Sequence, residues 1–449
     1  MEHFDLIVIG TGSAGSTVAY QCRAAGWQVA IVDSRPFGGT CALRGCDPKK
    51  VLVGAAELVD WQRRMQGLGV AADKVQIRWA ELMQFKRRFT DPVPQNRLDD
   101  YQQAGIATFQ GRARFLDQTT LQVGEDRLAA RHVVIASGAK PRDLGIPGAE
   151  LVTTSDQFLE LAHLPQRIIF IGGGYISFEF AHIAVRAGAE VCICHRGARP
   201  LEPFDADMVA TLVAASRALG IEVRLNSAVR AIEQGADGLQ VQTTTDGQQQ
   251  RLPADLVVHG AGRVPEIDDL DLATAGVARN ARGVLVNEYL QSISNPAVYA
   301  AGDAAAGGGP PLTPVAGAEG RVVAENLLQG NHQQPNYTGT PSVIFTIPPL
   351  AAVGLREEEA TQQGRKFTVH TDEMTGWYSA RRTNEQHTAF KVLVEDDTEQ
   401  ILGAHLLGTH AEEVINLFGL AMRHGLRASD LKSMIYAYPT KASDISYMV

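Results

Sequence analysis

Two stretches of the chain repeat one order of apolar and polar positions. Residues 4–33 and 167–196 each begin with a short apolar run, pass through a glycine-rich turn and a helical stretch, and end in a second apolar run. Apolar runs without alternation are typical of strands that are buried on both faces of a parallel sheet. The repeated pattern therefore predicts two βαβ units.

The segments between and after these units predict further elements. Residues 50–65 and 79–103 read as helices, and prolines interrupt the second stretch. Residues 220–260 alternate apolar and polar positions around an Asp-Gly pair, which predicts a β-hairpin or meander. Toward the C-terminus a strand-rich region is followed by an amphipathic helix near residues 411–424.

Stretches rich in glycine and proline suggest where the chain divides. "AAAGGGPPLTP" covers residues 304–314, and a linker-like "QGNHQQPNYTGTP" follows a helical stretch that ends near Leu328. The predicted blocks are residues 1–150, 151–260, 261–333 and 334–449.

The composition narrows the class of protein. The 449 residues include 41 basic and 50 acidic side chains, and the resulting net charge of -9 argues against nucleic acid or an anionic membrane as a partner. We find no apolar run near the roughly 20 residues of a membrane span and no secretory signal pattern. The odd count of 5 cysteines fits a reducing compartment. We therefore expect a cytoplasmic, multi-domain α/β protein.

The first glycine-rich turn has the spacing of a dinucleotide-binding fingerprint. Gly10, Gly12 and Gly15 follow the first predicted strand as G-x-G-x-x-G, and Asp33 closes the second strand. The first glycine makes the tight turn, the second lets backbone amides approach a pyrophosphate, and the third lets the helix pack on the sheet. Asp33 can accept hydrogen bonds from an adenosine ribose. A glycine-rich turn that binds no ligand is the alternative. The strand before the turn, the helix after it and the acid at Asp33 together favour dinucleotide binding.

The second turn keeps most of this pattern. Gly172 and Gly174 occupy the first two glycine positions, and Ser177 replaces the third, where a small residue still permits close helix packing. The second unit is therefore also predicted to bind a dinucleotide.

Basic residues follow the second strand of this unit where the first unit has an acid. An acid binds a ribose 2′-hydroxyl, whereas a basic cluster accommodates a 2′-phosphate, so His195, Arg196 and Arg199 favour NADPH over NADH. Ordinary surface charge is the alternative. Glu202, further along the same segment, is acidic, so the prediction depends on the two arginines.

A cysteine pair lies between the two units, in "GGTCALRGCDPKK". Cys41 and Cys46 stand at the predicted start of a helix, and an irregular helix start would let them form a strained, reducible disulfide. The helix N-terminus is expected to lower a thiolate pKa. Lys49 adds a positive charge about one helical turn after Cys46. Two structural cysteines are the alternative, but their positions beside glycines and a proline, rather than on an apolar face, argue against it.

These motifs resemble those of the class I pyridine nucleotide-disulfide oxidoreductases, a family that includes glutathione reductase, dihydrolipoamide dehydrogenase and mercuric reductase. The cysteine segment resembles the redox-active disulfide motif of the family. Further segments are similar to family motifs in the same order along the chain: "GRARF" at 111–115, "IASGAKP" at 135–141, "GRVP" at 262–265, "VYAAGDAA" at 298–305, "LTPVAGAEGR" at 312–321, "VIFTIPPLAAVG" at 343–354 and "ILGAHLLG" at 401–408.

The resemblance implies an architecture. It is an α/β fold with two Rossmann-like domains and a C-terminal α+β dimerisation domain. Residues 1–150 and 261–333 would form a discontinuous FAD-binding domain, residues 151–260 an inserted NAD(P)-binding domain, and residues 334–449 the interface of a homodimer.

The resemblance also implies roles for individual residues around the FAD. Asp303 would hold the ribityl chain, Gly138 would line the flavin side, and Lys49 and Glu179 would form an ion pair beside the flavin. Tyr175 would cover the nicotinamide site. Other cofactor-side positions in the matching motifs are Thr40, Ala113, Ser137, Gly262 and Thr313.

For the cysteines, the resemblance implies an order of electron transfer. Hydride passes from the nicotinamide to the flavin, and two electrons then enter the disulfide. Cys46 would be the thiol nearest the flavin and Cys41 the outer, interchange thiol. Cys22, Cys192 and Cys194 match no motif. Cys192 and Cys194 lie two positions apart in a predicted strand and are predicted to be core or packing residues.

The chain departs from the family at its C-terminal base. Where the family has a histidine oriented by a glutamate, this chain has Tyr438 and Ser443, with Asp444 one position later. A tyrosine of pKa about 10 donates a proton at pH 7 but scarcely accepts one. Rapid exchange with glutathione disulfide is therefore not expected. The chain also ends without the cysteine pair of mercuric reductases, which argues against mercury as the substrate.

A second departure lies beside the cysteines. Asp47 replaces an apolar residue next to Cys46, and a carboxylate close to a thiol would raise its pKa, opposing the effect of the helix end.

The sequence thus predicts an enzyme that passes electrons from NADPH through FAD and a Cys41–Cys46 disulfide to a small-molecule disulfide or another thiol-reactive acceptor. Tyr438 would act in the partner's active site as a proton donor or gate, and no resident metal is predicted. Two alternatives remain open. One is a reductase that passes electrons from the flavin directly to a quinone, oxygen or a metal ion, and the other is a redox-sensing flavoprotein without rapid turnover.

Overall fold

The computed structural model describes residues 1–71 and 75–449. Contacts between Cα atoms divide the chain into two compact units, each assembled from separate segments. Unit 1 comprises Met1–Lys49, Phe85–Arg142 and Arg263–Tyr337, and unit 2 comprises Lys50–Gln84, Asp143–Gly262 and Thr338–Val449.

Unit 1 is built on a mixed seven-stranded sheet in the order β3-β2-β1-β6-β5-β4, with β18 beside β6. The strands β1, β2, β3, β6 and β18 run parallel, whereas β4 and β5 continue the sheet as antiparallel strands. The apolar run Leu6–Ile9 lies within β1 and is buried, as its lack of alternation predicts. Because β18 comes from the segment after residue 263, the unit is discontinuous in sequence.

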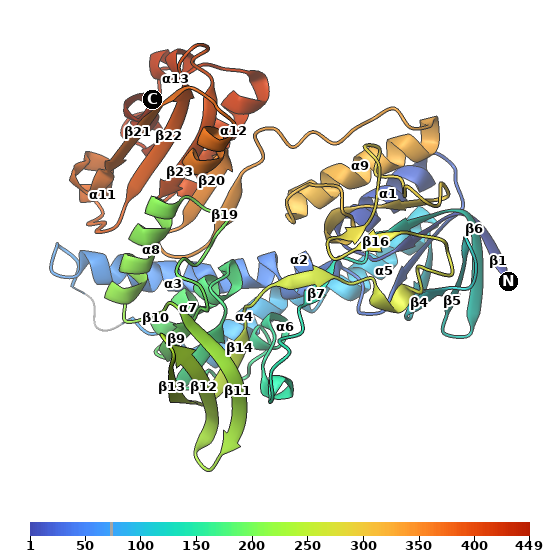
Figure 1. Cartoon of the computed structure of the whole chain (residues 1–449), viewed down its shortest axis with the longest axis horizontal. Helices are drawn as coiled ribbons and strands as arrows, with labels where there is room; N and C mark the ends of the chain where they lie inside the picture. The colour runs from blue at the N-terminus through green and yellow to red at the C-terminus, as the bar shows by residue number, and fades with distance from the viewer. Residues whose placement is uncertain (72–74) are drawn as a thin grey trace. The chain divides into compact units, whose positions relative to one another are not determined.

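The helices of unit 1 cover this sheet (Figure 1). Helix α9 packs against α1, and a Cβ at Gly320 would lie only 2.7 Å from the Ala14 carbonyl oxygen, so glycine is needed for this approach. The elements of the unit are β1 Glu2–Ile9, α1 Ser13–Ala24, β2 Val29–Asp33, α2 Gly39–Arg44, α5 Val93–Ala104, β3 Ala107–Gln110, β4 Ala113–Phe115, β5 Thr120–Val123, β6 Asp126–Ile135, β7 Ala139–Pro141, β15 Arg263–Pro265, β16 Arg279–Asn280, β17 Gly283–Val284, β18 Val298–Ala300 and α9 Thr313–Gln329.

Two long helices run across the division between the units. They are α3 Cys46–Met65 and α4 Trp79–Thr90. The stretch predicted as a helix over residues 79–103 is split at Pro92 into α4 and α5, because proline cannot supply the hydrogen bond that a continuous helix requires.

Unit 2 contains the second βαβ unit. Its parallel sheet has the order β10-β9-β8-β14, and the antiparallel meander β11-β12-β13 confirms the predicted hairpin region. These elements are α6 Ser155–Phe158, β8 Arg167–Ile171, α7 Tyr175–Arg186, β9 Glu190–Cys194, α8 Ala206–Ala218, β10 Glu222–Arg224, β11 Ser227–Gly235, β12 Gly238–Thr245, β13 Gln248–Ala254 and β14 Leu256–His259.

The C-terminal part of unit 2 is a five-stranded antiparallel sheet in the order β19-β20-β23-β22-β21. The predicted amphipathic helix is α12, which packs its apolar face on β20 and β23. These elements are β19 Ser342–Ile344, β20 Leu350–Gly354, α10 Glu357–Gln362, β21 Phe367–Glu373, α11 Tyr378–Arg381, β22 Ala389–Glu395, β23 Ile401–Leu407, α12 Ala411–His424, α13 Ala428–Ser433 and α14 Ile445–Met448.

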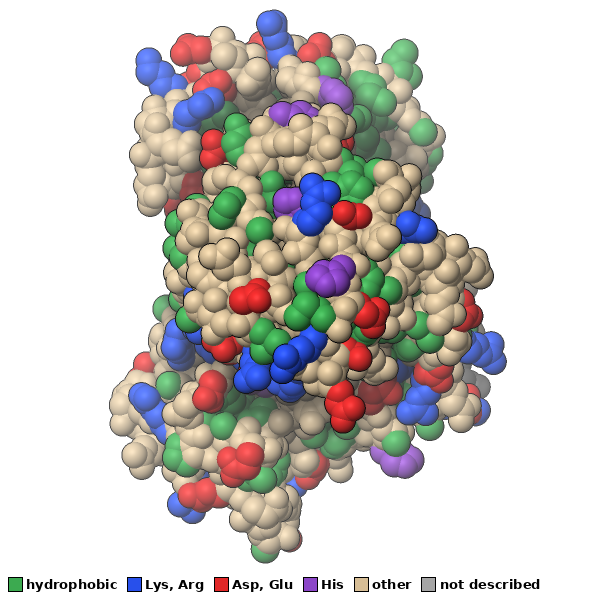
Figure 2. Space-filling model, turned by 90° about the vertical axis from the view of Figure 1, so that its right-hand side faces the viewer, with side chains coloured by type: hydrophobic (Ala, Val, Ile, Leu, Met, Phe, Trp, Pro, Cys, Tyr) green, Lys and Arg blue, Asp and Glu red, His purple; other side chains and the backbone are tan. Residues whose placement is uncertain are grey.

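The fold is therefore α/β with two Rossmann-like halves and a C-terminal α+β region, as predicted. The four block boundaries stay predictions, since contact density groups residues 143–262 with 338–449. None of the described helices is long and apolar enough to cross a membrane. Acidic and basic side chains are interspersed over the face shown in Figure 2.

Candidate active site

The first glycine-rich turn leaves no room for larger residues at two of its three glycines. Gly10 has a φ of +107°, and a Cβ there would overlap the carbonyl oxygen of Ala136 at the end of β6. A Cβ at Gly15 would overlap the Gly10 carbonyl oxygen. At Gly12, by contrast, nothing lies within 4 Å of a Cβ position, so the turn presents open space where a pyrophosphate can approach the backbone.

Asp33 closes β2 beside this turn. One carboxylate oxygen accepts the backbone N–H of Thr11 at 2.9 Å and the Thr11 hydroxyl at 2.5 Å, and the other accepts the N–H of Arg35 at 3.0 Å. These bonds fix the carboxylate next to the turn, where it can also receive a ribose hydroxyl.

Two further polar groups of unit 1 fit a bound FAD. The Ser137 hydroxyl is buried and has no hydrogen-bond partner in the described part of the chain. Burial raises the pKa of Asp303, and the guanidinium of Arg263 opposes that shift. A buried hydroxyl without a partner and a buried acid facing a cation can both bond to the polar chain of a cofactor.

The other predicted positions on the FAD side lie in the same unit or at its edge. Ala113 is buried in β4. Gly138, with φ +74°, has nothing within 4 Å of a Cβ position, and Gly262 has φ +107°. Both glycines therefore adopt a left-handed conformation that other residues rarely take.

The cysteine pair sits at a break between two helices. Cys41 lies in the short helix α2, and Cys46 is the first residue of α3. Between them, a Cβ at Gly45 would come within 2.9 Å of the Thr40 carbonyl oxygen. The helix is interrupted at Gly45, between the end of α2 and the start of α3, which is the irregular helix start that a Cys41–Cys46 disulfide would require.

The two cysteines form no disulfide in this structure, and their thiols interact with each other. The Cys46 thiol is the main cause that raises the pKa of Cys41, and burial acts in the same direction. The Asp47 carboxylate, 3.8 Å from the Cys41 sulfur, adds to this effect, and Thr313 opposes it. The expected lowering of the pKa by the helix end is therefore wrong for Cys41, since it donates to Cys46 and faces an acid. The predicted effect of Asp47 on a nearby thiol is found at Cys41, whose pKa its carboxylate helps to raise.

Thr313 joins the pair from a distant part of the chain. It is the first residue of α9, and its hydroxyl lies 3.6 Å from the Cys46 sulfur. The motif around Thr313 and the cysteine motif therefore meet in one place within unit 1.

The second glycine-rich turn has the same form as the first. Gly172 has a φ of +99°, and a Cβ there would lie 2.6 Å from the Gly260 carbonyl oxygen, while one at Gly174 would lie 3.1 Å from the same atom. The N–H of Gly173 donates to His195 Nδ1 at 3.1 Å, as the N–H of Thr11 donates to Asp33 in the first turn. His195 thus takes the structural place of the acid.

His195 contributes no charge to this site near neutral pH. Its Nε2 donates to the carbonyl oxygen of Arg199 at 2.9 Å, and burial lowers its pKa. A neutral ring satisfies both bonds. The positive charge of the loop therefore comes from Arg196, which is exposed, and Arg199, which pairs with Glu358 at 3.0 Å.

Three further predicted residues lie on helices. Lys49, on α3, is 7% exposed, and Glu179, on α7, is 5% exposed and accepts the N–H of Phe345 at 2.8 Å. Lys49 and Glu179 belong to different units, and their pairing stays a prediction. Tyr175, the first residue of α7, is half exposed.

The C-terminal segment exposes Tyr438, which is 79% accessible. Ser443 donates to the Thr440 carbonyl oxygen at 2.6 Å, and the buried Asp444 accepts the hydroxyl of Ser379 at 2.5 Å. Burial raises the pKa of Asp444. Both side chains that could have replaced the family's glutamate therefore have hydrogen-bond partners within this chain.

The comparisons with known proteins agree with this geometry. Residues 4–320 match the model of the family described as pyridine nucleotide-disulphide oxidoreductase, and residues 340–449 match its dimerisation domain. Glutathione reductase from Nostoc sp. (strain PCC 7120 / SAG 25.82 / UTEX 2576) is 30% identical over 99% of both chains.

Two further relatives carry other names. An uncharacterized 19.7 kDa protein in the mercuric resistance operon of Staphylococcus aureus is 52% identical over its whole length, which spans 40% of this chain. The HOCl-induced flavoprotein disulfide reductase RclA from Escherichia coli, solved as a Cu(II) complex, superposes with a TM-score of 0.88 at 27% identity, covering 100% of this chain and 99% of that one.

The chain therefore belongs to the class I pyridine nucleotide-disulfide oxidoreductases. It is an FAD-dependent, NAD(P)H-linked oxidoreductase of the disulfide type, with the dimerisation domain of that family at its C-terminus.

Sequence reasoning missed some residues of the site. Thr11 occupies an unspecified position of the fingerprint, and its hydroxyl fixes Asp33. Arg263 follows the predicted Gly262, and its side chain bonds the Ala139 carbonyl oxygen and faces Asp303. A hydroxyl inside the fingerprint and an arginine next to a family glycine were the available signals.

The turn at Gly10 generates a test. We expect Gly10→Ala to yield protein that is destabilised by more than about 3 kcal/mol and purifies with little FAD. The strain of the left-handed backbone and the overlap of the new Cβ with Ala136 both raise the free energy of the folded state. Gly26→Ala is the matched control, since Gly26 has φ +93° but nothing within 4 Å of a Cβ position. It should cost only about 1–2 kcal/mol. Flavin absorbance measures the FAD content of each variant, and urea unfolding measures its stability. Equal FAD content and equal stability of the two variants would contradict the role of the overlap.

Proposed function

We propose that this protein carries two electrons from NADPH, through FAD, to a Cys41–Cys46 disulfide and on to a small-molecule disulfide or another thiol-reactive acceptor. The observation that carries the proposal is the contact of the two thiols at the helix break, beside the first residue of α9. FAD, when bound, supplies the chemistry that links a hydride donor to a dithiol.

In this proposal the two cysteines have separate tasks. Cys41 is the interchange thiol, whose sulfur attacks an acceptor disulfide, forms a mixed disulfide with one half of it and releases the other half as a thiolate. Cys46 then displaces the product thiol from Cys41 and restores the intramolecular disulfide. The Cys46 thiol and burial raise the pKa of Cys41, so a smaller fraction of Cys41 is present as the nucleophilic thiolate at neutral pH.

A proton must also reach the departing thiolate of the acceptor. We propose that Tyr438 of the partner subunit supplies it in a homodimer, since the exposed C-terminal segment belongs to the family's dimerisation domain. A tyrosine donates but does not readily take a proton back, so this step favours acceptors whose leaving groups need little assistance. A cytoplasmic location suits a relay that returns to the dithiol form.

Lys49 and Glu179 are proposed to pair beside the flavin, where the charge of Lys49 would favour a reduced, negatively charged flavin. The glycines and acids of the first turn would hold the FAD, and Tyr175 would gate access to the nicotinamide. These roles follow the family pattern at matching positions of this chain.

A direct flavin reductase is the second candidate function. The operon of the Staphylococcus aureus relative and the Cu(II) complex of the Escherichia coli relative favour a metal ion as acceptor. Among residues 1–71 and 75–449, no group of three or more His, Cys, Asp or Glu side chains could hold a metal ion. The cysteine pair together with Lys49 argues against a redox sensor without rapid turnover.

The relay makes Cys41 indispensable for disulfide acceptors. Cys41→Ser is expected to lower turnover with the best disulfide more than about 100-fold, while NADPH still reduces the flavin. Cys22→Ser is the control, since Cys22 is buried in the apolar core of unit 1. Stopped-flow absorbance measures the reduction of the flavin by NADPH, and steady-state turnover measures electron transfer to the acceptor disulfide. Unchanged turnover in Cys41→Ser would favour direct transfer from the flavin, and a flavin that NADPH leaves oxidised in the wild type would favour the sensor.

The nucleotide preference depends on the charged loop after β9. A wild type with higher kcat/KM for NADPH than for NADH is expected, and Arg196→Gln should lower the NADPH value by about tenfold, because one charge-assisted contact to a phosphate is lost. The NADH value should not change. Arg230→Gln, in the meander, is a control for the loss of charge alone. A wild type that prefers NADH overturns this part of the proposal.

The proton step predicts weak activity with glutathione disulfide. Tyr438→His should raise that activity by at least about tenfold, because a histidine of pKa near 6.5 both takes and gives a proton at pH 7. Tyr447→His changes another exposed tyrosine of the same segment and should have no effect. A wild type that already reduces glutathione disulfide as fast as a dedicated reductase would show that Tyr438 does not limit the reaction.

A further inference from the structure

The two arginines of the loop after β9 have different surroundings. Arg196 is exposed, whereas the Arg199 guanidinium lies 3.0 Å from the carboxylate of Glu358, a residue of α10. Arg199 also donates to the Glu202 carbonyl oxygen at 3.3 Å. One of the two cations proposed to receive the 2′-phosphate is therefore already paired with an acid.

Glu358 is itself held between two arginines. Its second carboxylate oxygen lies 3.5 Å from Arg356, which donates to the Glu202 carbonyl oxygen at 2.8 Å and pairs with Glu359 at 2.6 Å. The two arginines thus meet at the same carbonyl oxygen and share one carboxylate. This arrangement keeps the Glu358 charge next to the nucleotide loop.

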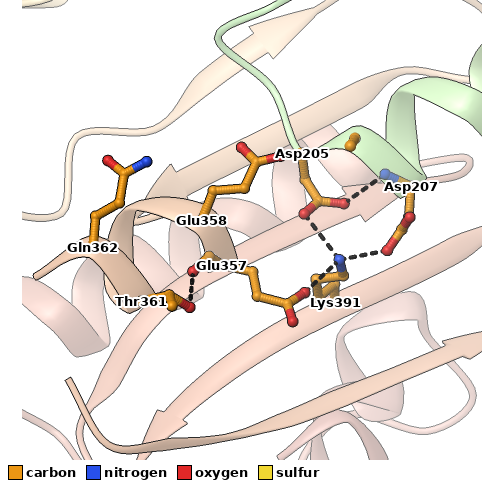
Figure 3. A pocket seen from close by; sticks show the side chains of 8 residues that line it. Asp205, Asp207, Glu357, Glu358, Thr361, Gln362 and Lys391 are labelled. Carbon is orange, nitrogen blue, oxygen red and sulfur yellow. Dashed lines mark hydrogen bonds and ion pairs between the residues drawn. The ribbon is translucent and has the colours of Figure 1, made fainter. Parts of the chain in front are cut away.

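The neighbouring acid of α10 has a different partner. Glu357 pairs with the buried Lys391 at 2.9 Å, and Lys391 also bonds Asp205 at 3.1 Å and Asp207 at 2.5 Å. Figure 3 shows Glu357 reaching toward Lys391, while the Glu358 side chain leaves the helix in another direction. The Lys391 cluster joins α8, α10 and β22 without Glu358, so Glu358 is not required for that contact.

We propose that Glu358 is a specificity-determining residue that competes with the 2′-phosphate of NADPH for Arg199 and thereby weakens the preference for NADPH over NADH. This inference rests on the proposed function, in which Arg196 and Arg199 receive the 2′-phosphate. NADH carries no group at that position, so its binding does not require Arg199 to leave Glu358.

The competition follows from charge and exposure. The Arg199 and Glu358 side chains are 34% and 50% exposed, so water screens their attraction and the pair is weak. A phosphate of up to two negative charges can replace the carboxylate on Arg199, but the displaced Glu358 stays nearby and repels it. His195 cannot offset this repulsion, because its neutral ring is committed to the turn.

Removing the Glu358 charge tests this competition. In Glu358→Gln holoenzyme, kcat/KM for NADPH should rise about three- to fivefold through a lower KM, with kcat and the NADH constants unchanged. The gain should shrink at high ionic strength, since salt screens exposed charges. Glu357→Gln removes the same charge one residue away and should leave the NADPH to NADH ratio unchanged.

A double-mutant cycle assigns the effect to Arg199. Arg199→Gln should lower kcat/KM for NADPH alone, and adding Glu358→Gln to that variant should give no further change. If Arg199→Gln lowers the NADPH value but Glu358→Gln leaves it unchanged or lowers it, the competition is overturned and the NADPH proposal stands. If Arg199→Gln leaves NADPH unaffected, Arg199 is not a phosphate ligand, and both the competition and that part of the proposed function fail.

Discussion

The contact between Cys41 and Cys46 depends on the break in the helix at Gly45. A continuous helix would turn the two side chains to different faces, whereas the tight approach of Gly45 to Thr40 ends α2 and lets Cys46 begin a new helix. The thiols then interact directly, and Thr313 reaches them from α9. The packing of α9 on α1 through Gly320 links this redox pair to the helix that follows the first glycine-rich turn.

The two nucleotide-binding turns share one hydrogen bond with different chemistry. In each turn, the N–H after the first glycine donates to the side chain that follows the second strand, Asp33 in one and His195 in the other. The bond preserves the turn in both units, but the side chain that accepts it is an acid only in the first. In the proposed function, the neutral ring of the second leaves nucleotide discrimination to the two arginines and to Glu358, which pairs with Arg199.

The sequence was sufficient for features that depend on local pattern. The βαβ units, the split of the helical stretch at Pro92 and the meander follow from periodicity and from glycine and proline, because these act on the neighbouring backbone. Contacts between distant segments carry no such signal. The pairing of Arg199 with Glu358 and the bond from Ser379 to Asp444 join residues far apart in the chain, so they required the structure. The predicted direction of the Cys41 pKa is wrong because the sequence pattern shows the helix end but neither the neighbouring Cys46 thiol nor the burial of Cys41.

The central claim is that Cys41 and Cys46 form a disulfide that takes electrons from the flavin. Its most direct test is to add one equivalent of NADPH to the oxidised holoenzyme without oxygen, alkylate the thiols, and identify the labelled cysteines by mass spectrometry. The account predicts that Cys41 and Cys46 become alkylated only after NADPH, while Cys22, Cys192 and Cys194 show equal labelling before and after. Cysteines 41 and 46 labelled equally before and after NADPH, with the flavin reduced, would contradict it.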